Sequence, residues 1–182
     1  MVPSMSTAAS PEVIGSDNTM SSSAPQATAI VVRPGEGQRV RAFGNEIEFM
    51  LSTEQTNGLL SLGLAVAPAG GGPPLHVHSR EDELFIIVEG DYEVFADGTW
   101  TPAGPGSVVF LPRGQAHTFR VVGNTTGRHW TIATPSGFEQ FFVKCSSAFP
   151  AAGPPDRAKL ATIAEEFGVT FARPAQPSPN VR

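Results

Sequence analysis

The stretch GGGPPLHVHSREDELFIIVEGDYEV, residues 70 to 94, holds two of the four histidines in a chain of 182 residues. His76 and His78 stand one residue apart, and the acids Glu81, Asp82 and Glu83 follow them. Successive side chains of a β-strand point to opposite faces, so residues two apart project from the same face. The stretch therefore predicts a strand that brings two imidazoles to one point, as binding to a single metal ion requires.

A third histidine and a carboxylate can join this pair. The segment GPGSVVFLPRGQAHTF, residues 104–119, predicts a strand, a turn at Pro112 and Gly114, and a second strand opened by His117. Glu83 has the wrong parity to share one unbroken strand face with His76 and His78, but the polar residues 79–82 interrupt that strand. If the next strand folds back beside the first, Glu83 faces the same cavity. Three histidines and one carboxylate suit Fe, Mn, Co, Ni, Cu or Zn, and suit Mg or Ca poorly.

Simpler interpretations exist for some of these residues. A His-x-His pair alone is often two half-buried strand histidines, and turns alone explain Pro112 and the nearby glycines. The fourth histidine, His129, has no partner at ligand spacing and is interpreted as a structural or pocket-rim residue. Cys145 is the one cysteine, with no base nearby to activate it, and is interpreted as a buried strand or core residue.

The rest of the chain predicts an all-β sandwich or barrel. Short β-branched or aromatic segments are separated by Gly, Pro, Asn or Asp, as is typical of such folds. One helix is expected within residues 155–167, where Leu160, Ile163, Ala164 and Phe167 share a face, and it ends at Gly168. We expect this face to pack on the outside of the barrel. The expected strands are residues 28–33, 46–51, 59–67, 84–90, 92–96, 107–112, 117–122, 129–134 and 138–144.

Composition limits the partners and sets the domain boundaries. A net charge of −5 without a Lys/Arg cluster argues against nucleic acid and anionic membranes. With no long apolar run and no secretory signal pattern, a cytoplasmic location is the default expectation. Residues 1–27 and 173–182 are poor in large apolar side chains, so we expect a disordered N-terminal tail and a flexible C-terminal tail. A barrel over 28–150 and a helical segment over 151–172 lie between them.

Two motifs in this order resemble those of the cupin superfamily. Gly70, His76-x-His78, Glu83 and Gly90 match its first motif, and Gly106, Pro112-x-Gly114 and His117 match its second. Val121 stands where the second motif usually has an asparagine. The resemblance implies an antiparallel jelly-roll barrel with a short C-terminal helix. It also implies a divalent metal site formed by His76, His78, Glu83 and His117.

The later segment HWTIATPSGFEQFFVKCSSAF, residues 129–149, with the helix after it, resembles small bacterial quercetinase-like cupins. That resemblance implies a dioxygenase that opens the ring of a flavonol, with one Ni, Mn, Co, Fe or Cu ion per chain and O₂ as co-substrate. Glu83 would be the general base that deprotonates the 3-hydroxyl, through whose oxygen the substrate binds the metal. A non-redox isomerase, cyclase or decarboxylase acting on a small carbonyl compound, or a non-catalytic small-molecule-binding cupin, remains an alternative.

The strands also suggest a pocket and an interface. Phe85 and Ile87 share parity with Glu83, and Phe119 shares parity with His117, so these side chains should line the interior. Further pocket candidates, whose facing the sequence leaves open, are Phe49, Leu62, Leu64, Trp130 and Ile132. An apolar pocket of this kind suits a small aromatic substrate. Segments 28–33 and 46–51 are expected edge strands, which favours a homodimer that covers them.

Overall fold

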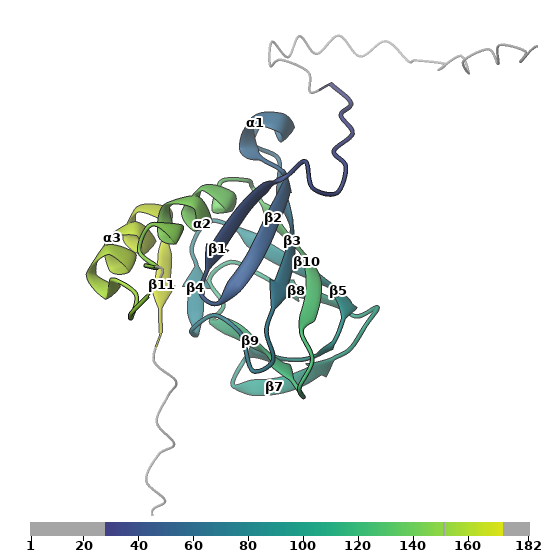
Figure 1. Ribbon diagram of the computed structural model, residues 1–182, viewed down its shortest axis with the longest axis vertical. Helices are drawn as coiled ribbons and strands as arrows, with labels where there is room; N and C mark the ends of the chain where they lie inside the picture. Colours follow the sequence, from purple (N-terminus) through teal and green to yellow (C-terminus); the bar gives the residue numbers. More distant parts are fainter. Residues whose placement is uncertain (1–27, 151, 173–182) are drawn as a thin grey trace, which may run out of the picture.

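The computed structural model describes residues 28–150 and 152–172, and the two expected tails lie outside the described residues. Two antiparallel sheets pack face to face as a jelly-roll barrel, which confirms the predicted fold class (Figure 1). One sheet has the order β1-β2-β3-β10-β5-β8, and the other has the order β11-β4-β9-β6-β7. The strands are β1 Gln38–Ala42, β2 Asn45–Leu51, β3 Ser61–Ala67, β4 His76–His78, β5 Asp82–Glu89, β6 Asp91–Ala96, β7 Thr99–Ala103, β8 Val108–Leu111, β9 His117–Val122, β10 Gly127–Thr134 and β11 Val169–Phe171.

Residues alternate between the two faces of each long strand. On β3 the inward positions carry small side chains, at Ser61, Gly63, Ala65 and Ala67. The same register turns His129, Thr131 and Ala133 of β10 inward. Small residues on the inner face of β3 leave room inside the barrel, while the larger Leu62, Leu64 and Val66 of the same strand lie on its outer face.

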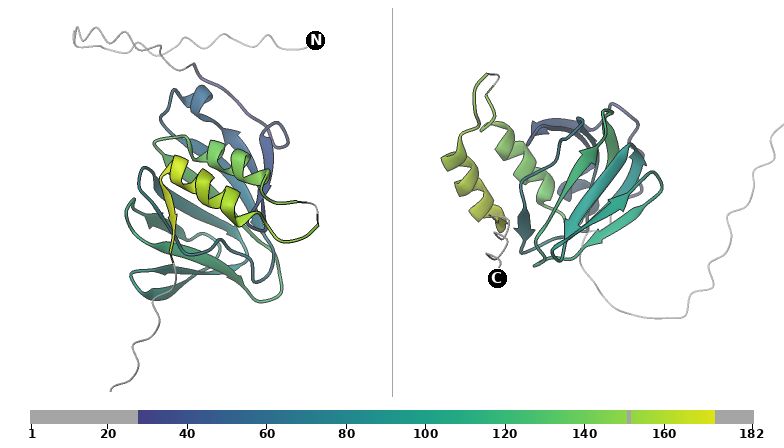
Figure 2. Two further views of the ribbon diagram at one scale, coloured as in Figure 1. Left: turned by 90° about the vertical axis from the view of Figure 1, so that its left-hand side faces the viewer. Right: turned by 90° about the horizontal axis from the view of Figure 1, so that it is seen from below.

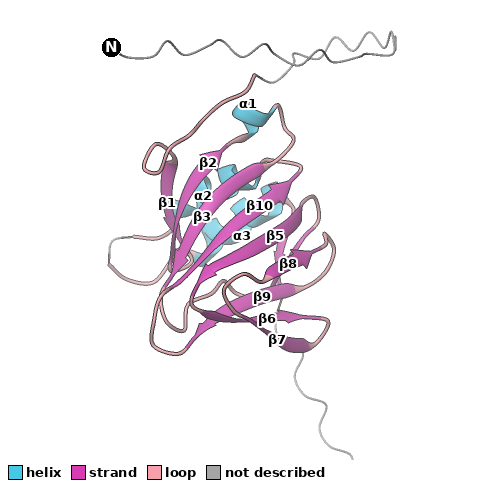
Figure 3. Ribbon diagram, turned by 90° about the vertical axis from the view of Figure 1, so that its right-hand side faces the viewer, coloured by secondary structure: helices cyan, strands magenta, loops and turns pink. Residues whose placement is uncertain are grey.

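Three short helices complete the described chain: α1 Thr53–Thr56, α2 Phe138–Ser146 and α3 Arg157–Phe167. Figure 2 shows α2 and α3 side by side over one side of the barrel, and Figure 3 shows the six-stranded sheet from the opposite side, without helices in front of it. None of the described helices is long and apolar enough to cross a membrane.

Two of the expected strands are wrong. Residues 28–33 form no strand, because no neighbouring strand pairs with them in the described structure. Residues 138–144 belong to α2 instead, since Phe138, Phe141 and Cys145 recur at helical spacing and are buried together. The short strands β1, β7 and β11 were not predicted as separate elements.

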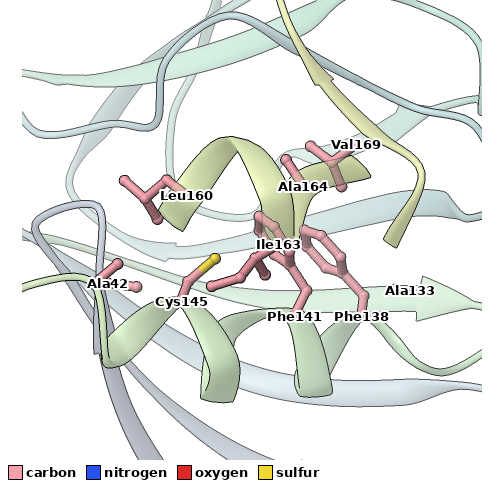
Figure 4. Packing of buried hydrophobic residues seen from close by; sticks show 10 residues of the cluster. Ala42, Ala133, Phe138, Phe141, Cys145, Leu160, Ile163, Ala164 and Val169 are labelled. Atoms are coloured by element: carbon pink, nitrogen blue, oxygen red, sulfur yellow. The ribbon is translucent and has the colours of Figure 1, made fainter. Parts of the chain in front are cut away.

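The C-terminal helix is confirmed, with one change in its packing partner. Helix α3 begins after Asp156, whose side chain accepts a hydrogen bond of 3.0 Å from the backbone N–H of Lys159. It ends at Gly168, which adopts the left-handed conformation at φ 70°. Its buried residues Leu160, Ile163 and Ala164 pack against α2 and β11 rather than directly on an outer sheet face (Figure 4).

The strand edges differ from those on which the homodimer was predicted. Residues 46–51 lie in β2, which pairs with β1 on one side and β3 on the other, so this segment is an inner strand. With residues 28–33 outside any strand, neither expected edge exists. The homodimer stays a prediction without support from these two segments.

Candidate metal centre in the barrel

His76 and His78 occupy β4 and point from the same face into the barrel, where both are buried. Their Nε2 atoms lie 3.0 Å apart. Strand β4 lies between β9 and β11, and the Cα atom of His76 is paired with that of His117 on β9. Gly72, in the segment that leads into β4, makes this approach possible, because a Cβ there would collide with the carbonyl oxygen of Phe119.

Glu83 reaches the same point from the other sheet. It lies on β5, paired with β10 and β8, and not on a strand beside β4 as expected. Its Oε2 atom is 3.3 Å from Nε2 of His117 and 3.7 Å from Nε2 of His78. Thr131 on β10 donates a hydrogen bond of 3.0 Å to Oε1 and so fixes the carboxylate. Glu83 therefore reaches the cluster from the opposite sheet. The alternation of side chains along β4 does not decide whether Glu83 faces the two histidines.

The outer nitrogens of the three rings face hydrogen-bond acceptors. Nδ1 of His76 lies 2.9 Å from the carbonyl oxygen of Pro74, and Nδ1 of His117 lies 2.9 Å from that of Gln115. Nδ1 of His78 faces Oε2 of the buried Glu81 at 3.7 Å, which is too long for a hydrogen bond. A neutral imidazole that donates from Nδ1 has its lone pair on Nε2. For His76 and His117 this arrangement therefore turns the Nε2 lone pair toward the centre of the cluster, as acceptors behind metal-bound histidines do.

The donor set fits a divalent transition metal. One ligand atom from each of His76, His78, Glu83 and His117 lies within 4.8 Å of all the others, and all four residues are buried. Ligands at about 2.0 to 2.2 Å from one metal lie roughly 3 to 4 Å apart, and the distances of 3.0, 3.3 and 3.7 Å given above for three pairs of these atoms fall in this range. Nε2 of His117 is buried without a hydrogen-bond partner among the described residues. A cation between these atoms would satisfy it and separate the two facing lone pairs of His76 and His78.

Burial sets the charge of two of these groups. Desolvation, with smaller effects from the neighbouring His78 and His117 rings, lowers the pKa of His76 to about 3. Burial alone would raise the pKa of Glu83, but the adjacent imidazoles outweigh it and lower that pKa to about 2. At neutral pH His76 is therefore uncharged and Glu83 is ionised, which are the states that bind a metal ion.

A small apolar cavity adjoins the cluster. It has a volume of about 40 Å³ and is bordered by His76, Glu83 and His117 together with seven phenylalanines. Three of these, Phe138, Phe141 and Phe142, come from α2, and the ring of Phe138 lies 4.3 Å from that of His78 between centroids. Helix α2 thus closes the barrel over the candidate metal centre.

A comparison with protein-family models decides the family of this barrel. Residues 63–132 match the model described as a cupin domain. They span the strands that carry all four cluster residues. This part of the chain is a cupin domain.

The proteins to which this chain is similar are named for diverse activities. A 116-residue part of the chain, 64% of it, is 25% identical to quercetin 2,3-dioxygenase of Bacillus subtilis, and the chain spans 34% of that relative's length. A predicted oxalate decarboxylase from Thermotoga maritima has 24% identity and a TM-score of 0.55, covering 58% of this chain and 99% of the other. The polyketide cyclase RemF from Streptomyces resistomycificus has 23% identity and a TM-score of 0.52, covering 60% and 81%. An RmlC-like cupin from Shewanella frigidimarina has 19% identity and a TM-score of 0.53, covering 63% and 99%.

The pocket of this cupin contains only some of the expected residues. Phe85 and Phe119 line the cavity. Ile87 and Phe49 are buried in the core away from it. The prediction that the remaining candidates line the pocket is wrong, because the strand register places them on the outer face of the six-stranded sheet. These residues are Leu62, Leu64, Trp130 and Ile132. Val121, at the position of the usual motif asparagine, is buried in the core.

Sequence reasoning missed several groups around the cavity of this cupin. His129, taken as structural or at the rim, is buried and borders the cavity, and so do Asn45 and Thr131. Strand parity could have found His129 and Thr131, since both share parity with the buried Ala133 on β10. The sequence does not distinguish Glu81 from the neighbouring acids Asp82 and Glu83, because its burial beside His78 depends on the conformation of the turn at residues 79–82.

Proposed function

We propose that this cupin is a metal-dependent dioxygenase that opens the heterocyclic ring of a flavonol. The observation that best supports this proposal is the buried cluster of three imidazoles and one ionised carboxylate beside an apolar, aromatic-lined cavity. The partial similarity to quercetin 2,3-dioxygenase supports the same choice of substrate. Flat aromatic ligands suit such a cavity, where phenylalanine rings can stack on them.

The protein's residues have distinct roles in this proposal. His76, His78, Glu83 and His117 would hold the metal, which when bound would supply Lewis acidity and open positions for substrate and O₂. Glu83 is ionised and accepts the proton of the substrate 3-hydroxyl at a carboxylate oxygen. Thr131, through its hydrogen bond to Oε1, keeps the other oxygen of Glu83 directed at the cluster. The surrounding phenylalanine rings exclude water from the reacting groups.

The cavity must enlarge before a flavonol enters. A volume of about 40 Å³ holds about three water molecules, far less than a three-ring ligand. The displaceable wall is α2, because its phenylalanines close the cavity from outside the two sheets. Substrate binding therefore includes a shift of α2 or rotation of its aromatic side chains.

Elemental analysis and an oxygen electrode test this function. Protein loaded in turn with Ni, Mn, Co, Fe and Cu should hold about one metal ion per chain and consume O₂ only when quercetin is added. Carbon monoxide should appear in equal amount to the O₂ consumed, since ring opening inserts both oxygen atoms and releases one carbon as CO. Metal binding without quercetin-dependent O₂ uptake would reject the dioxygenase and favour a non-redox carbonyl substrate.

Matched variants test the role of Glu83. Glu83→Gln should lose activity while part of the metal stays bound, because the amide cannot accept the proton. Glu89→Gln is the control, since Glu89 lies on the same strand with its side chain 62% exposed. Wild-type turnover by Glu83→Gln would remove its role as the base, and full metal occupancy in His76→Ala or His117→Ala would remove that residue from the site.

A further inference from the structure

His129 is a buried polar residue in the cavity that the proposed chemistry does not use. It lies on the inner face of β10, 2% exposed, two residues before Thr131. The rings of Phe85 and Phe119 lie 4.8 and 5.0 Å from its ring between centroids. A polar ring enclosed by aromatic side chains costs free energy unless its nitrogens have hydrogen-bond partners. One nitrogen, Nδ1, has such a partner in the protein, and the residue itself borders the cavity.

The protein partner is Tyr92, whose hydroxyl lies 3.0 Å from Nδ1 of His129. Tyr92 is 2% exposed, and burial raises the pKa of its hydroxyl, so it keeps its proton. Among the described residues this hydroxyl has no other hydrogen-bond partner. Its proton is satisfied only if Tyr92 donates and Nδ1 of His129 accepts.

The proton of the imidazole must then be on the other nitrogen. Burial lowers the pKa of His129 to about 4, so the ring is neutral and carries one proton. With Nδ1 accepting from Tyr92, that proton is on Nε2. Among the described residues Nε2 of His129 has no hydrogen-bond partner, and it is not one of the fully buried polar atoms left without one. His129 borders the cavity that Glu83 and His117 also line.

The surroundings of His129 keep space free for a ligand. Its neighbour across the ladder on β3 is Ala65, a small side chain that also lines the cavity. Thr131, the next inward residue of β10, bonds to Glu83, so one face of this strand connects His129 with the candidate metal centre. A ligand that reaches the cluster with one oxygen can present a second oxygen to His129.

We propose that the Nε2–H group of His129 donates a hydrogen bond to a carbonyl or phenolate oxygen of the ligand, and that Tyr92 is the positioning residue that fixes this tautomer. The ligand class that follows is an aromatic hydroxy ketone, with one oxygen at the cluster and its neighbour at His129. The ligand class rests on the proposed function, whereas the tautomer rests on the contact with Tyr92 and on the neutral state of the His129 ring. The two parts can therefore fail separately.

NMR of ¹⁵N-labelled full-length protein, metal-free and loaded with Zn²⁺, tests the tautomer. Long-range ¹H–¹⁵N spectra distinguish a ring protonated at Nε2 from one protonated at Nδ1, and the signals lost in His129→Gln assign the residue. His129 should be the Nε2–H tautomer, while His76 and His117, which donate from Nδ1, give the opposite pattern in the same spectrum. In Tyr92→Phe the His129 ring should become a mixture of both forms. A His129 protonated at Nδ1 in the wild type would overturn the inference.

Binding of 3-hydroxyflavone to the Zn²⁺-loaded protein tests the ligand. His129→Leu removes the donor and should weaken binding about tenfold, whereas His129→Gln keeps an N–H donor and should lose less. Tyr92→Phe should fall between the wild type and His129→Leu, with Zn²⁺ content unchanged in all three variants. Equal affinity of His129→Leu and wild type would overturn the donor role. Absence of binding by the wild type would reject the flavonol and this ligand class, with the NMR result still deciding the tautomer.

Discussion

Replacing His129 by glutamine should make the stability of the metal-free protein less sensitive to acid. In the folded state burial lowers the pKa of His129 from 6.5 to about 4. The unfolded chain exposes the ring and binds a proton below about pH 6.5, while the folded state does not bind one until about pH 4. Stability that is fully present above pH 6.5 is therefore lost as the pH falls toward 4.

The size of this effect follows from the two pKa values. At pH 5 nearly all unfolded molecules and few folded ones carry the proton on His129. Integrating the difference in bound protons from pH 7 to pH 5 gives a loss of about 1.8 kcal/mol for this one residue. Glutamine does not titrate, so His129→Gln should lose about 1.8 kcal/mol less than the wild type over the same interval. Contributions from His76 and Glu83 occur in both proteins and cancel in the comparison.

Urea unfolding at pH 7 and pH 5, in the presence of a chelator and followed by the fluorescence of Trp100 and Trp130, measures the difference. The control is Val121→Ala, which removes buried apolar volume without removing a titrating group and should keep the wild-type pH dependence. If His129→Gln and the wild type lose the same free energy within about 0.5 kcal/mol, His129 titrates normally in the folded state. Its enclosure as a neutral ring would then be wrong, and the tautomer argument would lose one support.

Three further experiments test Glu81, the buried Cys145 and the C-terminal helix. Glu81→Gln should weaken Zn²⁺ binding about 10- to 100-fold, because it removes the carboxylate that faces Nδ1 of His78 at 3.7 Å. Competition with a chromophoric chelator measures the affinity, and an unchanged affinity would show that Glu81 does not support His78 as a ligand. Cys145 is 0% exposed, and burial raises the pKa of its thiol to about 12. It should therefore react with a thiol reagent at pH 8 only as fast as the protein unfolds locally. Rapid labelling of the folded protein would contradict its burial. Asp156→Ala should lower the free energy of unfolding by about 1 kcal/mol by removing the N-cap of α3, and an unchanged urea midpoint would show that the cap contributes nothing.

The geometry of the cluster was predictable where it depended on local rules. His76 and His78 share a face because strand residues alternate, and this holds in any sheet that contains β4. The side from which Glu83 arrives was not predictable in this way. It depends on β4 and β5 belonging to opposite sheets, and the chain between them, residues 79–81, contains nothing that specifies a crossing from one sheet to the other.

The misassigned helix had a visible signal. Phe138, Phe141, Phe142 and Cys145 recur at the i, i+3, i+4, i+7 spacing of a helix face. Aromatic residues also favour strands, and this composition outweighed the spacing in the prediction. The pocket residues failed for a different reason. Large apolar side chains of β3 and β10 were expected inside, but the inner faces of these two strands hold small or polar residues such as Gly63, Ala65 and Thr131.

The elements that close the cavity also contact the strand that carries part of the candidate metal centre. Phe138 and Phe141 close the cavity, and both also pack with α3 in one core cluster, so α2 cannot move without disturbing α3 (Figure 4). Helix α3 continues directly into β11, whose backbone pairs with β4, with Val169 opposite His78. A ligand that displaces α2 therefore exerts force on the strand that holds two of the four cluster residues. Because β4 is only three residues long, its position depends on its pairing with β9 and β11, and we expect a ligand that displaces α2 to change the spacing of the histidines as well.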